Sequence, residues 1–285
     1  QIPGIARRVV DEIRRLTPAP VRYIVNTHWH GDHLLGNSVF REAFPEARIV
    51  AHSHTAAEGA RYYADYAAKS AERLPRAMDD MRRRRDASRS GEEREFLERT
   101  VACAERLLPE IPRTRYVAPD LLVDGSLRVE LGGVAVSVEH LGSGNTPGDL
   151  VAWVEGDRLV ATGDLLVHPA PYAIGSALEP WIATLGRLRA RNAAVIVPGH
   201  GPVMRDDRYL RDVEALIAGT HRQLTAMLAS GVARSEAAAR LDVAAFRDRY
   251  LDTPMRRQAF EQFFVKAAVQ KAYAAAAAPA TPAAR

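Results

Sequence analysis

The chain has 285 residues, of which 47% are hydrophobic and 26% are charged, and its formal net charge is +4. These proportions are ordinary for a soluble globular protein, and the length suits one large domain or two small ones. No run of about 18 apolar residues occurs, so the sequence predicts no membrane-spanning helix. The single cysteine, Cys103, excludes an intrachain disulfide framework, and its place in a helical apolar pattern predicts a buried structural thiol.

The first sixty residues predict alternating helices and strands. Apolar side chains at helical spacing predict an amphipathic helix over residues 5–16. The elements that follow are a strand over 21–26, a polar loop over 27–33, a helix over 34–44 and a strand over 48–52. This order indicates an α/β fold, with the polar loop at the carboxyl end of a strand, where layered α/β folds place their chemistry.

That polar loop reads T-H-W-H-G-D-H. It carries three imidazoles and one carboxylate within six residues, from His28, His30, Asp32 and His33. Imidazole and carboxylate together bind a borderline cation such as zinc. The alternative is a polar surface loop rich in histidine. The preceding apolar strand and the further candidate ligands downstream favour the metal site.

Residues 55–115 differ from the rest of the chain in being rich in alanine, arginine and glutamate. They predict a helical hairpin inserted between strands, and Ser90 with Glu93 has the form of a capping box that begins its second helix. The run of four arginines at 82–85 admits binding of an anion or nucleic acid. Three neighbouring aspartates and the lack of interleaved aromatics favour a solvated helix face instead.

The second half of the chain returns to strands and then becomes helical. A period-two apolar pattern predicts β-hairpins over 126–138 and 150–161. Further along, the sequence predicts a helix over 180–191, a buried strand over 194–197 and helices over 206–230, 235–246 and 254–275. Thr253 and Pro254 form the expected start of the last helix.

Four polar motifs follow strand patterns in order: His28–His33, Gly142–Asp149, Thr162–Asp164 and Pro198–His200. Together they resemble the metallo-β-lactamase-fold hydrolases. The resemblance covers about residues 5–210 and implies an αββα sandwich that holds one or two metal ions at the edge between two sheets. It also implies small-molecule substrates, and neither nucleic acid nor a membrane is expected as a partner; the oligomeric state stays open.

The resemblance also implies a division of the chain. We expect a metallo-β-lactamase-like domain over 1–210, interrupted by the helical insertion at 55–115. A helical C-terminal extension over 206–273 and a disordered tail over 274–285 would follow. Members of the family begin with several strands that this chain does not show before its first helix, so we expect the N-terminal strands of the first sheet to be missing. The chain starts with Gln1 and shows no signal peptide, which leaves a cytoplasmic or a periplasmic location open.

The ligand set follows from the same resemblance, residue by residue. His28 and His30 would hold the first metal, and Asp32, His33 and His200 the second, while Asp164 would bridge the two. A metal lowers the pKa of bound water to about 7 and polarises the bond to be cleaved. Asp32 and Asp164 are therefore the expected catalytic carboxylates, Asp32 with the alternative role of carrying a proton to the leaving group.

Asn145 departs from the family pattern, which has histidine in the middle of the G-x-T loop as the third ligand of the first metal. An amide oxygen is a weaker zinc ligand than imidazole, so we expect a strong second site and a weak first one. A subgroup of the family with a similar G-N-T-x-G-D loop makes the asparagine natural. His140 is an alternative ligand, although a local hydrogen bond at a strand end is the favoured interpretation.

Three further residues are expected to line the substrate pocket. Trp29 lies between two candidate ligands, and His168 and Tyr172 follow Asp164 closely in the chain. The leading hypothesis is a zinc-dependent hydrolase of an ester, lactone, lactam or thioester-type bond, with iron or manganese as alternative metals. Two other hypotheses remain: a mononuclear iron enzyme resembling persulfide dioxygenases, and a degenerate metal-binding protein without catalysis.

Overall fold

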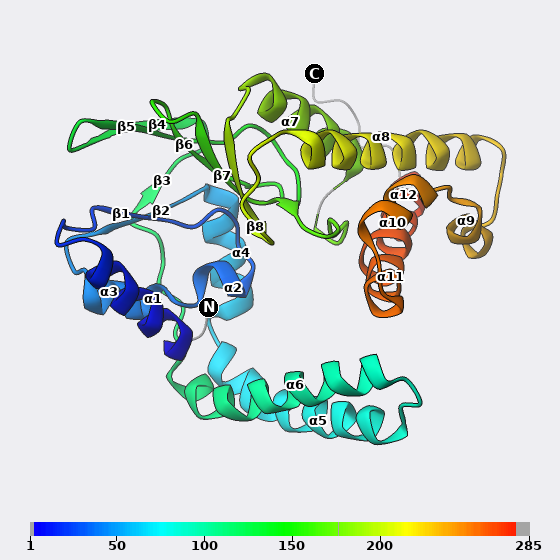
Figure 1. Ribbon diagram of the computed structural model, residues 1–285, viewed down its shortest axis with the longest axis horizontal. Helices are drawn as coiled ribbons and strands as arrows, with labels where there is room; N and C mark the ends of the chain where they lie inside the picture. The colour runs from blue at the N-terminus through cyan, green and yellow to red at the C-terminus, as the bar shows by residue number, and fades with distance from the viewer. Residues whose placement is uncertain (1–2, 176, 278–285) are drawn as a thin grey trace. The chain divides into compact units, whose positions relative to one another are not determined.

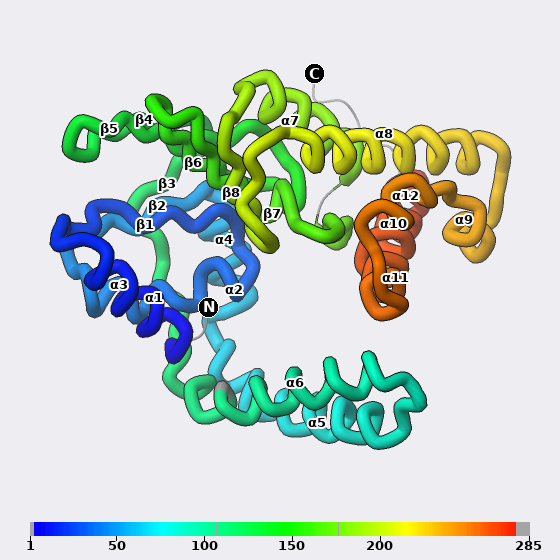
Figure 2. The backbone as a smooth tube through the Cα atoms, viewed as in Figure 1, coloured from blue at the N-terminus to red at the C-terminus, as the bar shows by residue number. Residues whose placement is uncertain are grey.

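The computed structural model describes residues 3–175 and 177–277. Contacts between residues divide the chain into two compact units, Gln1–Asp124 and Gly125–Arg285. Each unit has its own β-sheet with helices, so the chain is mixed α/β (Figures 1 and 2). Among the described residues, no helix is both long and apolar enough to cross a bilayer.

The first unit is built on a three-stranded parallel sheet in the order β1-β2-β3. The strands are β1 (Tyr23–Val25), β2 (Arg48–Ala51) and β3 (Leu121–Leu122). The central strand β2 is buried along its last three residues, as a strand with neighbours on both sides requires. Beside the sheet, helix α1 (Pro3–Leu16) packs its buried Ala6 and Val10 against Val39 of α3 (Asn37–Ala43).

The predicted helix over 34–44 is in fact two helices. The structure has a short α2 (Gly31–Leu34) followed by α3, with Leu35 and Gly36 between them. The predicted loop therefore ends early, because Gly31, Asp32 and His33 already lie on α2. The consequence is that the second half of the T-H-W-H-G-D-H motif is held by helical geometry rather than by a loop.

The segment between β2 and β3 is helical, as predicted. It contains α4 (Ser53–Tyr63), α5 (Tyr66–Ala87), α6 (Gly91–Leu107) and a 3₁₀ turn (Leu108–Arg113). Helices α5 and α6 lie side by side as a hairpin (Figure 1). The Ser90 hydroxyl accepts a hydrogen bond from the Glu93 N–H, which confirms the predicted N-cap of α6. Cys103 is exposed on α6, so the prediction of a buried thiol is wrong; the helix buries the side that carries Leu97 and Val101 instead.

The four arginines of α5 are paired with carboxylates on the surface. Arg82 binds Asp79 and Glu105, and Arg84 binds Glu93 of α6. The other two pair with aspartates of their own helix. The predicted solvated helix face is confirmed, and the pairs to Glu105 and Glu93 link the two helices of the hairpin.

The second unit is built on a five-stranded sheet in the order β4-β5-β6-β7-β8. Its strands are β4 (Ser126–Leu131), β5 (Val134–Glu139), β6 (Val151–Val154), β7 (Leu159–Val167) and β8 (Val195–His200). Neighbours are antiparallel from β4 to β7, which confirms both predicted hairpins, whereas β7 and β8 are parallel.

Strands β7 and β8 continue further than the sequence predicts. The T-G-D and P-G-H motifs were expected to follow strands, but both lie inside strands because Gly163 pairs with Pro198 and Val167 with His200. The pairing is irregular at these points, with register shifts on both sides of Gly163. Such bulges re-aim side chains next to functional sites.

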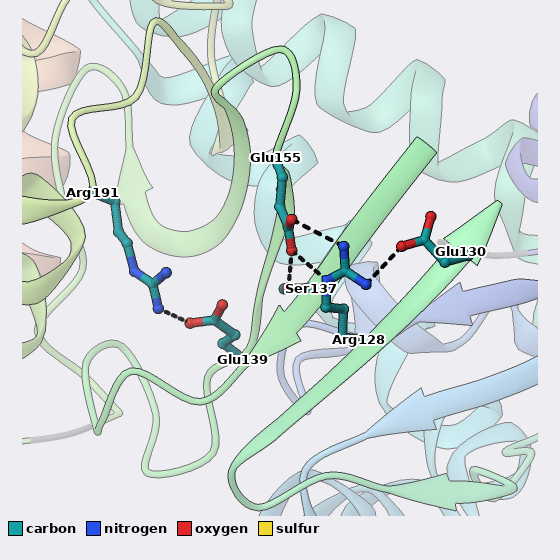
Figure 3. A network of polar contacts seen from close by, with 6 residues as sticks. All are labelled: Arg128, Glu130, Ser137, Glu139, Glu155 and Arg191. Atoms are coloured by element: carbon teal, nitrogen blue, oxygen red, sulfur yellow. Dashed lines mark hydrogen bonds and ion pairs between the residues drawn. The ribbon is translucent and has the colours of Figure 1, made fainter. Parts of the chain in front are cut away.

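Polar side chains link the outer strands β4 and β5 of this sheet. The Arg128 guanidinium binds Glu155 at 3.0 Å and Glu130 at 2.6 Å, and the Ser137 hydroxyl donates to Glu155 at 2.9 Å (Figure 3). Arg191 binds Glu139 beside this group. Because Arg128 and Ser137 are cross-strand partners, Glu155, which directly follows β6, joins β4 and β5 through one carboxylate.

The main hydrophobic core lies on the same face of the sheet, because Ser137 pairs with Trp153, Trp153 with Val160 and Val160 with Ile196. Helices α7 (Leu178–Ala190) and α8 (Arg208–Ala229) pack together and supply the fully buried Trp181, Leu185 and Val213. These side chains contact the buried Val160 and Ile196 of the sheet, in one cluster that also includes the C-terminal helices.

The C-terminal part is helical but more divided than predicted. The structure has α9 (Arg234–Arg240), α10 (Ala244–Tyr250), α11 (Pro254–Phe260), a π-helical turn η2 (Glu261–Val265) and α12 (Lys266–Ala277). The predicted helix over 235–246 is broken at residues 241–243, where the Asp242 carboxylate accepts from the Ala244 N–H and starts a new helix. Thr253 caps α11 with Pro254 in its first turn, as predicted. Residues 274–277 of the expected disordered tail are helical, since alanine favours helix; residues 278–285 lie outside the described residues.

Candidate metal centre

The first unit brings two imidazoles of the histidine motif together. His28 Nε2 and His30 Nδ1 are 3.0 Å apart, and their rings are nearly perpendicular with centroids 4.5 Å apart. His33 joins them, with its ring centroid 4.2 Å from that of His28. His28 is fully buried, which fixes the position of its ring.

This geometry suits a metal ion. At zinc–nitrogen distances of about 2.0–2.1 Å, two ligands of a tetrahedral ion lie roughly 3.3 Å apart, close to the spacing of His28 Nε2 and His30 Nδ1. The other ring nitrogen of His28 lies 3.1 Å from the Thr27 hydroxyl. A hydrogen bond on the second nitrogen is the usual way in which a ligating histidine is oriented.

Asp32 and His33 lie on α2 and form the second part of the motif. The His33 Nε2 and Asp32 Oδ2 atoms are 3.2 Å apart, while the Asp32 side chain is 56% exposed and open to solvent. An imidazole beside a carboxylate that reaches water can both bind a cation and transfer a proton.

A pair of buried amides holds this turn in place. Asn26 Nδ2 donates to the His33 carbonyl at 3.1 Å and to Asn37 Oδ1 at 3.1 Å, and Asn37 Nδ2 donates back to Asn26 Oδ1 at 2.8 Å. Both side chains are almost completely buried. Asn26 and Asn37 therefore tie β1, α2 and α3 to one another around the histidines. Neither residue was predicted as part of the site, although a polar residue at the end of an apolar strand is a usable signal.

Aromatic side chains of α4 cover Trp29. Its ring stacks on Tyr62 at 4.6 Å between centroids and lies at a distance of 6.5 Å from Tyr63. Burial and the negative charge of Asp32 raise the pKa of Tyr63 to about 12, so this phenol stays protonated at neutral pH. Helix α4 thus supplies aromatic side chains next to the motif. The sequence had predicted only Trp29 as an aromatic residue at this place.

In the second unit, Asp164 of β7 and His200 of β8 meet across adjacent parallel strands. Asp164 Oδ1 lies 3.5 Å from His200 Nε2; the carboxylate is buried and the imidazole is 44% exposed. Gly199 makes this approach possible, because a Cβ at that position would lie 2.0 Å from Asp164 Oδ1. The P-G-H motif thus needs its glycine for close contact with the acidic residue.

The loop that carries Asn145 is tightly bonded. The buried Asp149 carboxylate accepts from the Thr146 N–H at 2.9 Å and from its hydroxyl at 2.8 Å. Burial raises the pKa of Asp149 to about 7 against the effect of these hydrogen bonds. His140 Nδ1 lies 3.0 Å from the Asp149 carbonyl oxygen, the local hydrogen bond expected for a histidine at a strand end.

His168 and Tyr172 follow β7 and contact the C-terminal helices. The His168 ring lies 5.0 Å from that of Tyr209 in α8, and the His168 backbone N–H donates to the His200 carbonyl at 3.0 Å. Burial and the nearby Arg256 guanidinium lower the pKa of His168, which favours the neutral imidazole. Tyr172 is exposed and meets Phe263 edge to face, with centroids 5.8 Å apart. Neither contact with the extension was predicted.

The described residues thus include histidine and aspartate groups that could hold a metal ion; their members are His28, His30, Asp32, His33, Asp164 and His200. The first unit supplies four of these residues and the second unit two. Imidazole and carboxylate donors fit zinc, iron or manganese alike, so the donor set does not choose the metal.

Comparisons with known proteins identify the family. The model of the metallo-beta-lactamase superfamily matches residues 3–200, and the chain belongs to that superfamily. A linear primary-alkylsulfatase from Pseudomonas sp. (strain ATCC 19151) is 24% identical over 250 residues, which cover 81% of this chain and 44% of that protein.

Solved structures agree on the fold. An inverting sec-alkylsulfatase from Pseudomonas sp. has a TM-score of 0.58 at 16% identity, covering 85% of this chain and 39% of that one. A metallo-beta-lactamase from Pontibacter korlensis has a TM-score of 0.50 at 20% identity, covering 74% and 76%. The chain therefore spans less than half the length of either alkylsulfatase. The predicted family and its mixed α/β fold with a C-terminal helical extension are confirmed.

Proposed function

We propose that the protein is a metal-dependent hydrolase that uses zinc to activate water against an ester-type bond in a small molecule. The 3.0 Å spacing of the His28 and His30 nitrogens supports this most directly, because it is close to the roughly 3.3 Å expected between two ligands of one tetrahedral ion. Superfamily relatives named as an alkylsulfatase and a β-lactamase, both hydrolases, agree with it.

In this proposal His28 and His30 would hold one metal and Asp32, His33 and His200 a second, and Asp164 would be a ligand as well. When bound, the metal supplies hydroxide at neutral pH and polarises the scissile bond. The buried Asp164 contributes negative charge that retains the ion, and its contact with His200 orients both groups. The solvent-open Asp32 carries a proton toward the leaving group.

The proposed substrate class rests on the type of bond that is cleaved and on the named relative. The ester, lactone, lactam and thioester bonds of the leading hypothesis share an electrophilic carbonyl that a metal-activated hydroxide attacks. The alkylsulfatase relative adds sulfate esters to this set. We place carboxylic and sulfate esters first, and the proposal depends on turnover of at least one of them.

The test is turnover of zinc-loaded protein against esters, sulfate esters, a lactone, a lactam and a thioester. Asp164→Ala and His200→Ala should lose both metal and activity, whereas His168→Ala should keep the metal. No turnover across the whole panel by metal-replete protein would refute the proposal and support the non-catalytic alternative. Oxygen uptake with a persulfide by the iron-loaded protein would support the dioxygenase alternative instead.

A further inference from the structure

An exposed apolar surface lies beside the residues that follow β7. Tyr172, Ile174 and Phe263 are large hydrophobic side chains that are 36%, 49% and 44% exposed, and the rings of Tyr172 and Phe263 are in contact. Phe263 comes from the C-terminal extension, about 90 residues away in sequence. We call these three residues the apolar ledge.

The ledge is held together by specific contacts. The Ala173 N–H donates to the Phe263 carbonyl at 2.9 Å, so Tyr172 and Ile174 flank that carbonyl on either side. The Phe263 ring meets Tyr172 nearly perpendicularly, at 5.8 Å between centroids. Phe263 lies in the π-helical turn η2, a rare element that is frequent at functional sites.

Tyr172 and Ile174 belong to the segment from His168 to Gly175. Both ends of this segment contact candidate metal residues of the same unit. At one end, His168 donates its N–H to the His200 carbonyl. At the other end, a Cβ on Gly175 would lie 1.9 Å from the Asn145 carbonyl oxygen, so the backbones touch there. Tyr172 is four residues from His168, a reach of at most about 14 Å. Tyr172 therefore lies within about 14 Å of His168, whose backbone is bonded to that of His200.

We propose that the apolar ledge binds the non-reacting apolar part of the substrate, so that the substrate is an ester with a long alkyl or aryl group. This inference rests on the proposed hydrolase function and adds to it a preference for substrates with a long apolar group. The three side chains offer apolar area and, apart from the Tyr172 hydroxyl, no polar group that would select a charged or sugar-like substituent. Each methylene removed from water stabilises the bound state by about 0.8 kcal/mol, which is roughly a fourfold gain per carbon.

The experiment compares short-chain and long-chain members of one series of primary alkyl sulfates and one of carboxylic esters. In the unaltered protein, kcat/KM should rise with chain length until the ledge is covered. Phe263→Ala and Tyr172→Ala should lower kcat/KM about tenfold for the long chain, mostly through KM, and leave the short chain unchanged. Phe263→Leu should restore most of the loss. Val134→Ala, which removes an exposed apolar side chain outside the ledge, is the matched control.

A binding measurement separates this inference from the proposed function. Long-chain and short-chain alkyl sulfonates, which cannot be hydrolysed in the same way, are titrated by calorimetry into the same proteins. Weaker binding of only the long sulfonate to Phe263→Ala supports the ledge even if no ester is turned over. Turnover without dependence on chain length, or equal loss for short and long chains, would overturn the ledge and leave the hydrolase intact.

Discussion

Gly199 and Asp164 approach so closely that a methyl group on the glycine would lie 2.0 Å from the Asp164 carboxylate oxygen. The contact joins the P-G-H motif of β8 to the T-G-D motif of β7, two segments 35 residues apart that each carry a proposed ligand. The neighbouring atoms are backbone as well as side chain, so the strands cannot simply shift to make room.

Gly199→Ala should therefore displace Asp164 and weaken metal binding by at least about tenfold, a cost of about 1.4 kcal/mol. The dissociation constant for zinc is measured by competition with a chelator, with circular dichroism as a check on folding. Gly156→Ala is the matched control, because nothing lies within 4 Å of its added methyl group. Unchanged zinc affinity in a folded Gly199→Ala protein would contradict the proposed role of Asp164.

Asn37→Ala removes one half of the buried amide pair. Asn26 then loses both a donor and an acceptor in a buried place, which costs about 1–3 kcal/mol. The free energy of unfolding, measured with denaturant, should fall by about that amount, and zinc affinity should fall because the His33 turn is less constrained. Ser38→Ala, a neighbouring polar change outside the pair, should have little effect. An equal free energy of unfolding for Asn37→Ala and Ser38→Ala would show that the amide pair does not stabilise the fold.

Asp149 predicts a pH dependence of stability in metal-free protein. Its pKa is raised by burial to about 7, against about 3.9 for an unfolded aspartate. The folded state therefore holds a proton that the unfolded state releases. The stabilisation of the folded state by protonated Asp149 is complete below about pH 4 and is lost as the pH rises toward about 7. Unfolding of the chelator-treated protein should become easier over this range. In Asp149→Asn, which cannot titrate, this decrease of the free energy of unfolding with pH should be absent. An equal decrease in Asp149→Asn and in the unaltered protein would exclude Asp149 as its source.

The sequence could predict the order of the motifs and most elements, because ligands and apolar periodicity are local features. It could not predict that Asp164 and His200 lie inside strands, since the parallel pairing of β7 with β8 depends on distant residues. The amide pair of Asn26 and Asn37 was missed for the same reason: its two members are 11 residues apart and only the tertiary structure joins them. The contact of Phe263 with Tyr172 is more distant still, and the π-helical turn has no clear sequence signal.

Asn145 carries a separate prediction about the two metal positions. An amide oxygen holds zinc less firmly than imidazole, so the position of His28 and His30 should be less occupied than that of Asp32, His33 and His200. Mass spectrometry of the native protein should find close to one tightly held equivalent, and Asn145→His should raise this toward two. Two tightly held equivalents in the unaltered protein would refute the unequal sites. Asn145→Gln, which keeps an amide, is the control for disturbance of the loop.

The central claim is that His200 and Asp164 belong to a metal centre that performs hydrolysis. The most direct measurement is the metal content and ester turnover of His200→Ala, determined on the same sample as the unaltered zinc-loaded protein. We predict loss of bound metal together with loss of turnover, in a protein that remains folded. A His200→Ala protein that is free of metal and still hydrolyses the substrate would contradict the account.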